Sequence, residues 1–117
     1  MQQVILFENE EFGQIRSIEI DGLPYFVGKD VAEILKYKDT SDALKRHVDS
    51  EDKLSRCFTD SGQSREMYVI NESGLYSLIL SSKLPTAKAF KRWVTSEVLP
   101  SIRKTGGYIQ ETNPYSI

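Results

Sequence analysis

A run of basic residues between positions 88 and 95 has the spacing of an anion-binding surface. On an α-helix, at about 100° per residue, one side of this run spans about 100° and holds Lys88, Lys91, Arg92 and Thr95. The other side is apolar and holds Ala87, Phe90, Trp93, Val94 and Val98. Because a line of cations can follow a phosphate backbone, we predict nucleic-acid contacts for Lys88, Lys91 and Arg92. The alternative is a solvated helix face.

A second candidate surface lies in residues 26–48, FVGKDVAEILKYKDTSDALKRHV, a pattern typical of two short amphipathic helices joined by a polar break. In a helix-turn-helix, the second helix presents its N-terminal side chains to base edges. The side chains in the break and on the exposed arc of the second helix that we predict to contact DNA are Lys36, Lys38, Ser41, Lys45 and Arg46. The alternative is a solvated helix with an Asp42–Arg46 ion pair at i, i+4 spacing.

Charge is unevenly distributed along the 117 residues, whose net charge is -2. Residues 1–35 carry seven acidic and two basic side chains, a balance of -5. Residues 83–104 carry six basic side chains and one acidic, a balance of +5, and this count adds Arg103 and Lys104 to the candidate phosphate contacts. The local field of that segment can attract phosphate although the whole chain is acidic.

Residues with catalytic or metal-binding chemistry are scarce. One histidine and one cysteine cannot form a Cys/His zinc cluster, and a single cysteine excludes an internal disulfide and suits a reducing cytoplasm. A Cys57–His47 dyad is conceivable, but Cys57 falls within a predicted strand and His47 on an apolar helix face. We therefore expect no enzyme, no metal and no cofactor. The longest apolar stretch, LYSLIL, is too short to cross a membrane.

The elements that must position these side chains alternate between strands and helices. VILFE, IRSIEI and LPYFV have strand composition, and Asp21-Gly22 predicts a tight hairpin turn before the last of them. KLSRCF and REMYVI predict a second hairpin around Gly62. The absence of a regular strand-helix-strand rhythm favours an α+β fold.

Helices are predicted between and after the hairpins. The two short helices follow the N-terminal hairpin, with Thr40 or Ser41 as the cap of the second, and Asn71 caps a helix after the second hairpin. A longer C-terminal helix begins at Thr86, breaks at Pro100 and ends at Gly106-Gly107. In that helix we expect Trp93 to be a core residue rather than a stacking platform for bases.

Glu97 falls between Trp93 and Val98 on the apolar side of the same helix. A carboxylate there is costly without a partner, so we expect a structural partner such as Arg103, Lys83 or backbone N–H groups. The alternative is a rotated helix that leaves Glu97 in water.

Four separate motifs in this sequence resemble one known family. FVGKDVAEILKY, ALKRHVDSEDK, INESGLYSLILSSKLPTAKAFKRWV and SEVLPSIRKTGGY occur in the order found in the BRO-type N-terminal domain, Bro-N, of phage and prophage antirepressors and of BRO proteins of large DNA viruses. The similarity runs from about Phe12 to Tyr108. Where family members often have Leu-Gly-Tyr after the first helix, this chain has Leu35-Lys36-Tyr37. Lysine there implies either a strained left-handed residue, at a cost of about 1 kcal/mol, or a differently shaped turn.

The resemblance implies a non-catalytic DNA-binding module in a transcriptional regulator of a phage antirepressor type, acting in the cytoplasm of a bacterial host. It implies double-stranded DNA as the partner. The alternative is a protein-interaction module that captures a repressor or host factor, which the acidic N-terminal third would suit. Residues 1–108 are the predicted domain, and residues 109–117 a flexible tail or truncated linker. The sequence leaves open a homo-oligomer and whether a C-terminal domain is missing.

Overall fold

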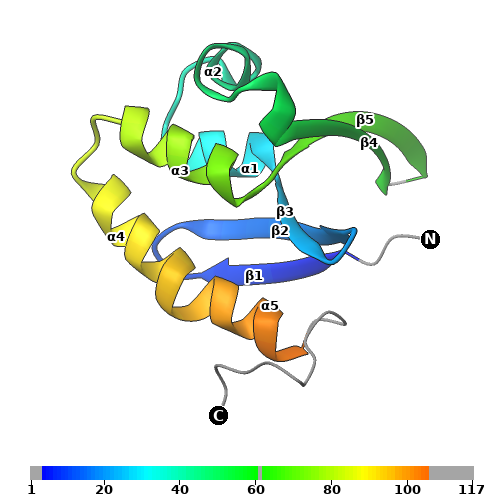
Figure 1. Ribbon diagram of the computed structural model, residues 1–117. Helices are drawn as coiled ribbons and strands as arrows, with labels where there is room; N and C mark the ends of the chain where they lie inside the picture. The colour runs from blue at the N-terminus through cyan, green and yellow to red at the C-terminus, as the bar shows by residue number, and fades with distance from the viewer. Residues whose placement is uncertain (1–3, 61, 106–117) are drawn as a thin grey trace.

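Five antiparallel strands form one sheet in the order β1-β2-β3-β5-β4 (Figure 1). The computed structural model describes residues 4–60 and 62–105, without the side chains of residues 60 and 103–105. The strands are β1 Ile5–Asn9, β2 Gly13–Ile20, β3 Leu23–Val27, β4 Lys53–Asp60 and β5 Gln63–Ile70. The N-terminal hairpin is therefore part of a three-stranded meander. The strands of the second hairpin are longer than the predicted runs KLSRCF and REMYVI.

Both predicted hairpin turns depend on backbone conformations with positive φ. Asp21 and Gly22 have φ of 53° and 80°, and they connect Ile20 directly to Leu23 in the β2–β3 ladder. Two consecutive positive values are the geometry of the tight turn that Asp-Gly predicts. Gly62, with φ of 79°, lies between β4 and β5.

Helices follow the hairpins in the predicted order. They are α1 Gly28–Ile34, α2 Thr40–His47, η1 Ser50–Asp52, α3 Glu72–Ser81, α4 Thr86–Trp93, η2 Val94–Val98 and α5 Leu99–Thr105. The cap of α2 is Asp39, whose carboxylate accepts from the Asp42 amide at 3.0 Å, so the prediction of Thr40 or Ser41 is wrong by one or two residues. The predicted cap of α3 is confirmed, because the Asn71 side chain accepts from the Gly74 amide at 2.9 Å.

The predicted break at Pro100 takes the form of a π-helical turn just before it. Proline has no N–H to donate, and its ring crowds the carbonyl four residues earlier. Residues 94–98 absorb this with i→i+5 bonding, in which the Leu99 amide donates to the Val94 carbonyl. Helical winding then continues through Pro100 into α5. The predicted end at Gly106-Gly107 and the domain boundary at residue 108 lie outside the described residues.

The helices pack on the sheet around one large core and leave a smaller one beneath the second hairpin. Figure 1 shows α1, α2 and α3 above β1–β3, with α4 on their left and α5 beneath β1. The large core includes Phe26, Leu75 and Phe90, each fully buried. The smaller core consists of Ile18, Val27, Phe58 and Val69. The α+β class with its two hairpins and paired short helices is confirmed.

No helix in the described part of the chain is long and apolar enough to cross a membrane.

Candidate nucleic-acid interface

Aromatic packing fixes which side of α4 faces outward. Phe90 is fully buried, and Trp93 is 7% exposed, which confirms its predicted core position. Phe12, from the turn between β1 and β2, stacks on Trp93 with ring centroids 5.9 Å apart and meets Phe90 edge-on at 5.5 Å. These contacts hold the helix in one rotation about its axis, so the opposite side points into solvent.

That exposed side carries Lys88, Lys91 and Arg92, which we call the cationic face of α4. Among the described residues, none of the three forms a salt bridge with a carboxylate. The adjoining Thr95 and Ser96 are also exposed, but their hydroxyls donate back to the carbonyls of Lys91 and Arg92. The cationic face therefore offers three unneutralised charges from a rigid helix.

Glu97 does not occupy the apolar position that helical periodicity predicts. Its side chain is exposed, so the predicted position on the apolar side is wrong and the alternative of a helix that leaves Glu97 in water is the one observed. No partner of Glu97 occurs among the described side chains. The physical reason is the π-helical turn, which inserts one extra residue into the helix. Buried side chains on successive turns are therefore five residues apart instead of four, as in the pairs Trp93/Val98 and Val94/Leu99. The extra residue rotates Glu97 out of the core and into water.

Lys36 ends α1 in a left-handed conformation, with φ of 63°. Its amide donates to the Glu33 carbonyl and the Tyr37 amide to the Ala32 carbonyl, both at 3.0 Å, which is the Schellman pattern of helix ends. The strained lysine expected from the missing glycine is thus present. Lys36 and Lys38 are both exposed, and no salt bridge involves either one within the described residues.

Close backbone packing positions α2. A Cβ on Gly28, at the start of α1, would lie 2.7 Å from a methyl carbon of Leu44, so glycine lets α1 and α2 approach each other. The Lys53 ammonium, from β4, donates to the carbonyl of the same Leu44 at 3.0 Å and ties α2 to the sheet. The exposed side of α2 is thereby fixed on the outside of the molecule.

The exposed side of α2 has nearly balanced charge. Ser41, Lys45 and Arg46 are exposed as predicted, but Arg46 lies 3.5 Å from Asp42, the ion pair of the alternative interpretation. Asp39, the cap of α2, adds a further carboxylate at its N-terminus. Lys45 forms no salt bridge among the described residues. This face therefore attracts phosphate less strongly than the cationic face of α4.

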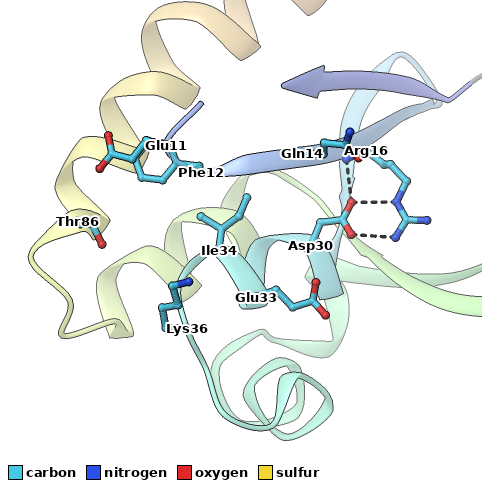
Figure 2. A pocket seen from close by; sticks show the side chains of 9 residues that line it. All are labelled: Glu11, Phe12, Gln14, Arg16, Asp30, Glu33, Ile34, Lys36 and Thr86. Atoms are coloured by element: carbon cyan, nitrogen blue, oxygen red, sulfur yellow. Dashed lines mark hydrogen bonds and ion pairs between the residues drawn. The ribbon is translucent and has the colours of Figure 1, made fainter. Parts of the chain in front are cut away.

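A cleft of about 610 Å³ lies between α1, the β1–β2 turn and the start of α4 (Figure 2). On one wall the Arg16 guanidinium binds the Asp30 carboxylate through two hydrogen bonds of 2.9 and 2.8 Å, and the Arg16 amide adds a third. Lys36 and Thr86 line the same cleft, so Lys36 lies on the side where α4 begins. The Arg16–Asp30 pair was not predicted, because only the folding of α1 against β2 brings two residues fourteen positions apart together.

The remaining candidates divide between packing and residues without described side chains. His47 is half-buried with its ring 5.5 Å from that of Tyr37, and Cys57 is exposed on β4. Burial raises the pKa of Tyr37 above its ordinary value of 10.0, and its hydroxyl donates to the Leu78 carbonyl at 2.8 Å. The side chains of Arg103 and Lys104, on α5, lie outside the described residues. No cluster of three metal-ligating side chains occurs among the residues that the structure describes.

Comparisons with known proteins agree on one family. A family model described as the BRO family, N-terminal domain, matches residues 14–100. The putative Bro-N domain-containing protein 289L of Invertebrate iridescent virus 6 is 44% identical over 123 residues, covering 89% of this chain and 29% of that protein. An uncharacterized protein of Haemophilus influenzae is 43% identical over 84 residues, covering 72% of this chain and 42% of that protein.

A third relative lies further away in sequence. The uncharacterized Bro-N domain-containing protein ORF2 of Autographa californica nuclear polyhedrosis virus is 31% identical over 118 residues, covering 87% of this chain and 36% of that protein. The chain thus spans less than half the length of these three relatives. No solved structure matches it. The matched family model and the viral and bacterial relatives show that this chain belongs to the Bro-N family.

Proposed function

We propose that this Bro-N domain binds double-stranded DNA and serves, without catalysis, as the DNA-binding part of a transcriptional regulator of the phage antirepressor type. The observation that carries the proposal is the cationic face of α4, where Lys88, Lys91 and Arg92 are exposed and free of carboxylates among the described residues. Because the three charges lie on one helix face, their fields add and attract phosphate although the whole chain has a net charge of -2.

Phosphate contacts by this face supply affinity without sequence preference. Each phosphate neutralised on duplex DNA lowers the logarithm of the binding constant by about 0.9 per tenfold rise in salt. Three contacts therefore give a slope of about -2.7. Lys36 and Lys38 are further phosphate contacts in this proposal, because both are exposed and Lys36 lies toward the start of α4.

Sequence choice is assigned to α2 in the same proposal. Ser41 and Lys45 are exposed on its outer side, and hydroxyl and ammonium groups can hydrogen-bond to base edges. Arg46 forms an ion pair with Asp42, so it contributes less to DNA binding in this proposal.

A salt series of binding to random double-stranded DNA tests the proposal. Reversing two charges, Lys91→Glu with Arg92→Glu, should weaken binding to every sequence and flatten the salt slope by about 1.8, because two phosphate contacts are lost.

The matched control is Lys29→Glu with Arg65→Glu. These two cations are also exposed but lie at the start of α1 and on β5, so the net charge changes equally while the cationic face is intact. The control should keep the wild-type slope. DNA binding through α4 would be refuted if the two double variants had the same salt slope. It would also be refuted if the wild type did not bind at low salt.

A second candidate function, capture of a repressor or another host protein, is favoured by the cleft of Figure 2. Its rim carries the exposed carboxylates of Glu11 and Glu33, which form no salt bridge within the described residues. Such a rim suits a basic segment of a protein partner. Absence of DNA binding at low salt would favour this function over the first.

A further inference from the structure

The β4–β5 hairpin extends well beyond the rest of the sheet. β5 pairs with β3 only at Val69 and Ile70, whereas it pairs with β4 along all eight residues. We call the projecting part, residues 54–60 and 62–68, the arm, which reaches to the right in Figure 1. Within the described residues, the outer edge of β4 has no strand partner.

Among the residues that the structure describes, core packing supports one face of the arm, and no strand pairs with the outer edge of β4. Phe58, which is 8% exposed, and Met67 pack in the smaller core with Ile18 and Val69. A two-stranded ribbon alone is marginally stable in water, and further strands are what stabilise it. The arm therefore has a reason to gain a strand from outside the sheet.

β4 lacks most features by which proteins block edge pairing. It has eight residues, contains no proline, and keeps one unbroken register with β5 from Lys53↔Ile70 to Asp60↔Gln63, so no bulge bends it away. Lys53 is turned inward onto Leu44. Arg56 is the one obstacle on the described part of the strand, since its guanidinium donates to the Ser55 carbonyl at 3.0 Å.

We propose that β4 pairs antiparallel with β4 of a second copy of this chain, with Cys57 on the two-fold axis. Opposite residues of an antiparallel pair lie on the same face, so a symmetric pair must place one residue opposite its own copy. Centring on Arg56 or on Cys57 gives the longest overlap. Centring on Arg56 sets two guanidinium groups against each other, which is unfavourable, and centring on Cys57 avoids this.

The Cys57 register fits the side chains that it brings together. Cys57 is exposed and small, so two copies can face each other without a clash. Ser55 would lie opposite Thr59 of the second copy. The Ser55 hydroxyl donates to the Glu66 carboxylate at 2.6 Å, so its oxygen can accept a cross-strand hydrogen bond from the Thr59 hydroxyl. The pairing requires Arg56 to release the Ser55 carbonyl, which then accepts from the new strand.

Cys57 itself provides the test. Opposite Cα atoms are about 4.5–5.5 Å apart, within the range of about 4.4–6.8 Å that a disulfide spans. Oxidation with diamide should therefore join two Cys57 thiols in a disulfide while diamide is reduced, and sedimentation should show a concentration-dependent dimer without oxidant or DNA. Cys57→Lys should weaken dimerisation by about fivefold through like-charge contact on the axis. That variant should still fold, because residue 57 faces Glu66 within its own ladder.

Cysteines placed elsewhere test the register. With Cys57→Ser as background, a mixture of Ser55→Cys and Thr59→Cys chains should form the mixed disulfide. Neither variant should form a disulfide alone, because its two copies would be about 13 Å apart along the strand. The controls are on β5. Ser64→Cys should form no disulfide, and Ser64→Lys should dimerise as the wild type does.

Three results would overturn the proposal. The first is a wild type that stays monomeric at its highest soluble concentration. The second is a dimer that Ser64→Lys weakens as much as Cys57→Lys does. The third is a crosslink that forms only when DNA is added, which would make the arm a nucleic-acid contact instead. The first two results are measured without DNA, so they do not depend on whether the cationic face of α4 binds DNA.

Discussion

Lys36 combines a strained backbone conformation with an exposed positive charge. Its left-handed backbone costs about 1–2 kcal/mol for a residue with a Cβ, and glycine would adopt the same Schellman geometry freely. The lysine nevertheless adds an exposed charge beside the start of α4. A strained position that gains a cation is consistent with a contact to phosphate.

Lys36→Gly should therefore make the domain more stable and bind DNA less tightly. Relief of the left-handed strain exceeds the added entropy of an unfolded glycine, so the free energy of unfolding should rise by about 0.5–1 kcal/mol. The salt slope of binding should flatten by about 0.9. Urea unfolding and the salt series measure the two changes.

Lys36→Ala separates the two effects, because alanine keeps the strain and removes the charge. Its salt slope should match that of Lys36→Gly, whereas its stability should not rise. Unchanged DNA binding in both variants would remove Lys36 from the proposed interface.

At the scale of elements, local signals predicted the fold well. Asp21-Gly22 specified its turn, Asn71 its cap, and the apolar spacing of 87–94 the buried side of α4. The predictions that failed were those that depended on the exact position of a residue along a helix. Asp39 replaced Thr40 or Ser41 as the cap, and the π-helical turn rotated Glu97 into water, a change that strict helical periodicity cannot represent.

The candidate site was predictable only in part. Exposure of the cationic face follows from the spacing of Lys88, Lys91 and Arg92, which one helix determines. The Arg16–Asp30 pair, the cleft and the arm depend on contacts between distant segments, and no local pattern reports them. Tertiary packing decides such features.

The helix α2 leads to a prediction about specificity rather than affinity. Lys45→Ala should reduce the ratio of specific to non-specific DNA affinity, because a lost base contact is worth about 1–3 kcal/mol of discrimination. Lys38→Ala is the matched control, since it removes an equal charge from the preceding break and should lower both affinities together. Competition binding at one fixed salt concentration measures both. If Lys45→Ala leaves the ratio untouched, α2 serves only as scaffold.

For the whole molecule, the two cores imply two levels of stability. The large core joins the helices to β2, β3 and β5, whereas the smaller core joins the arm to the other face of the sheet. Loss of the first should unfold the domain, and loss of the second should open the arm while the rest stays folded, because β5 pairs with β3 only at Val69 and Ile70, outside the arm.

Phe90→Ala and Phe58→Ala test this difference with the same chemical change in each core. Phe90 is fully buried, so its truncation should lower the free energy of unfolding by about 3–5 kcal/mol and speed exchange of the most protected amides throughout the domain. Phe58→Ala should speed exchange mainly in residues 54–60 and 62–68 and change the amides of α3 much less. Hydrogen exchange at low protein concentration, where copies do not associate, measures both. Equal acceleration of α3 amides in the two variants would mean that the arm and the helical core unfold as one unit, and the arm would then be too firmly integrated to gain stability from an added strand.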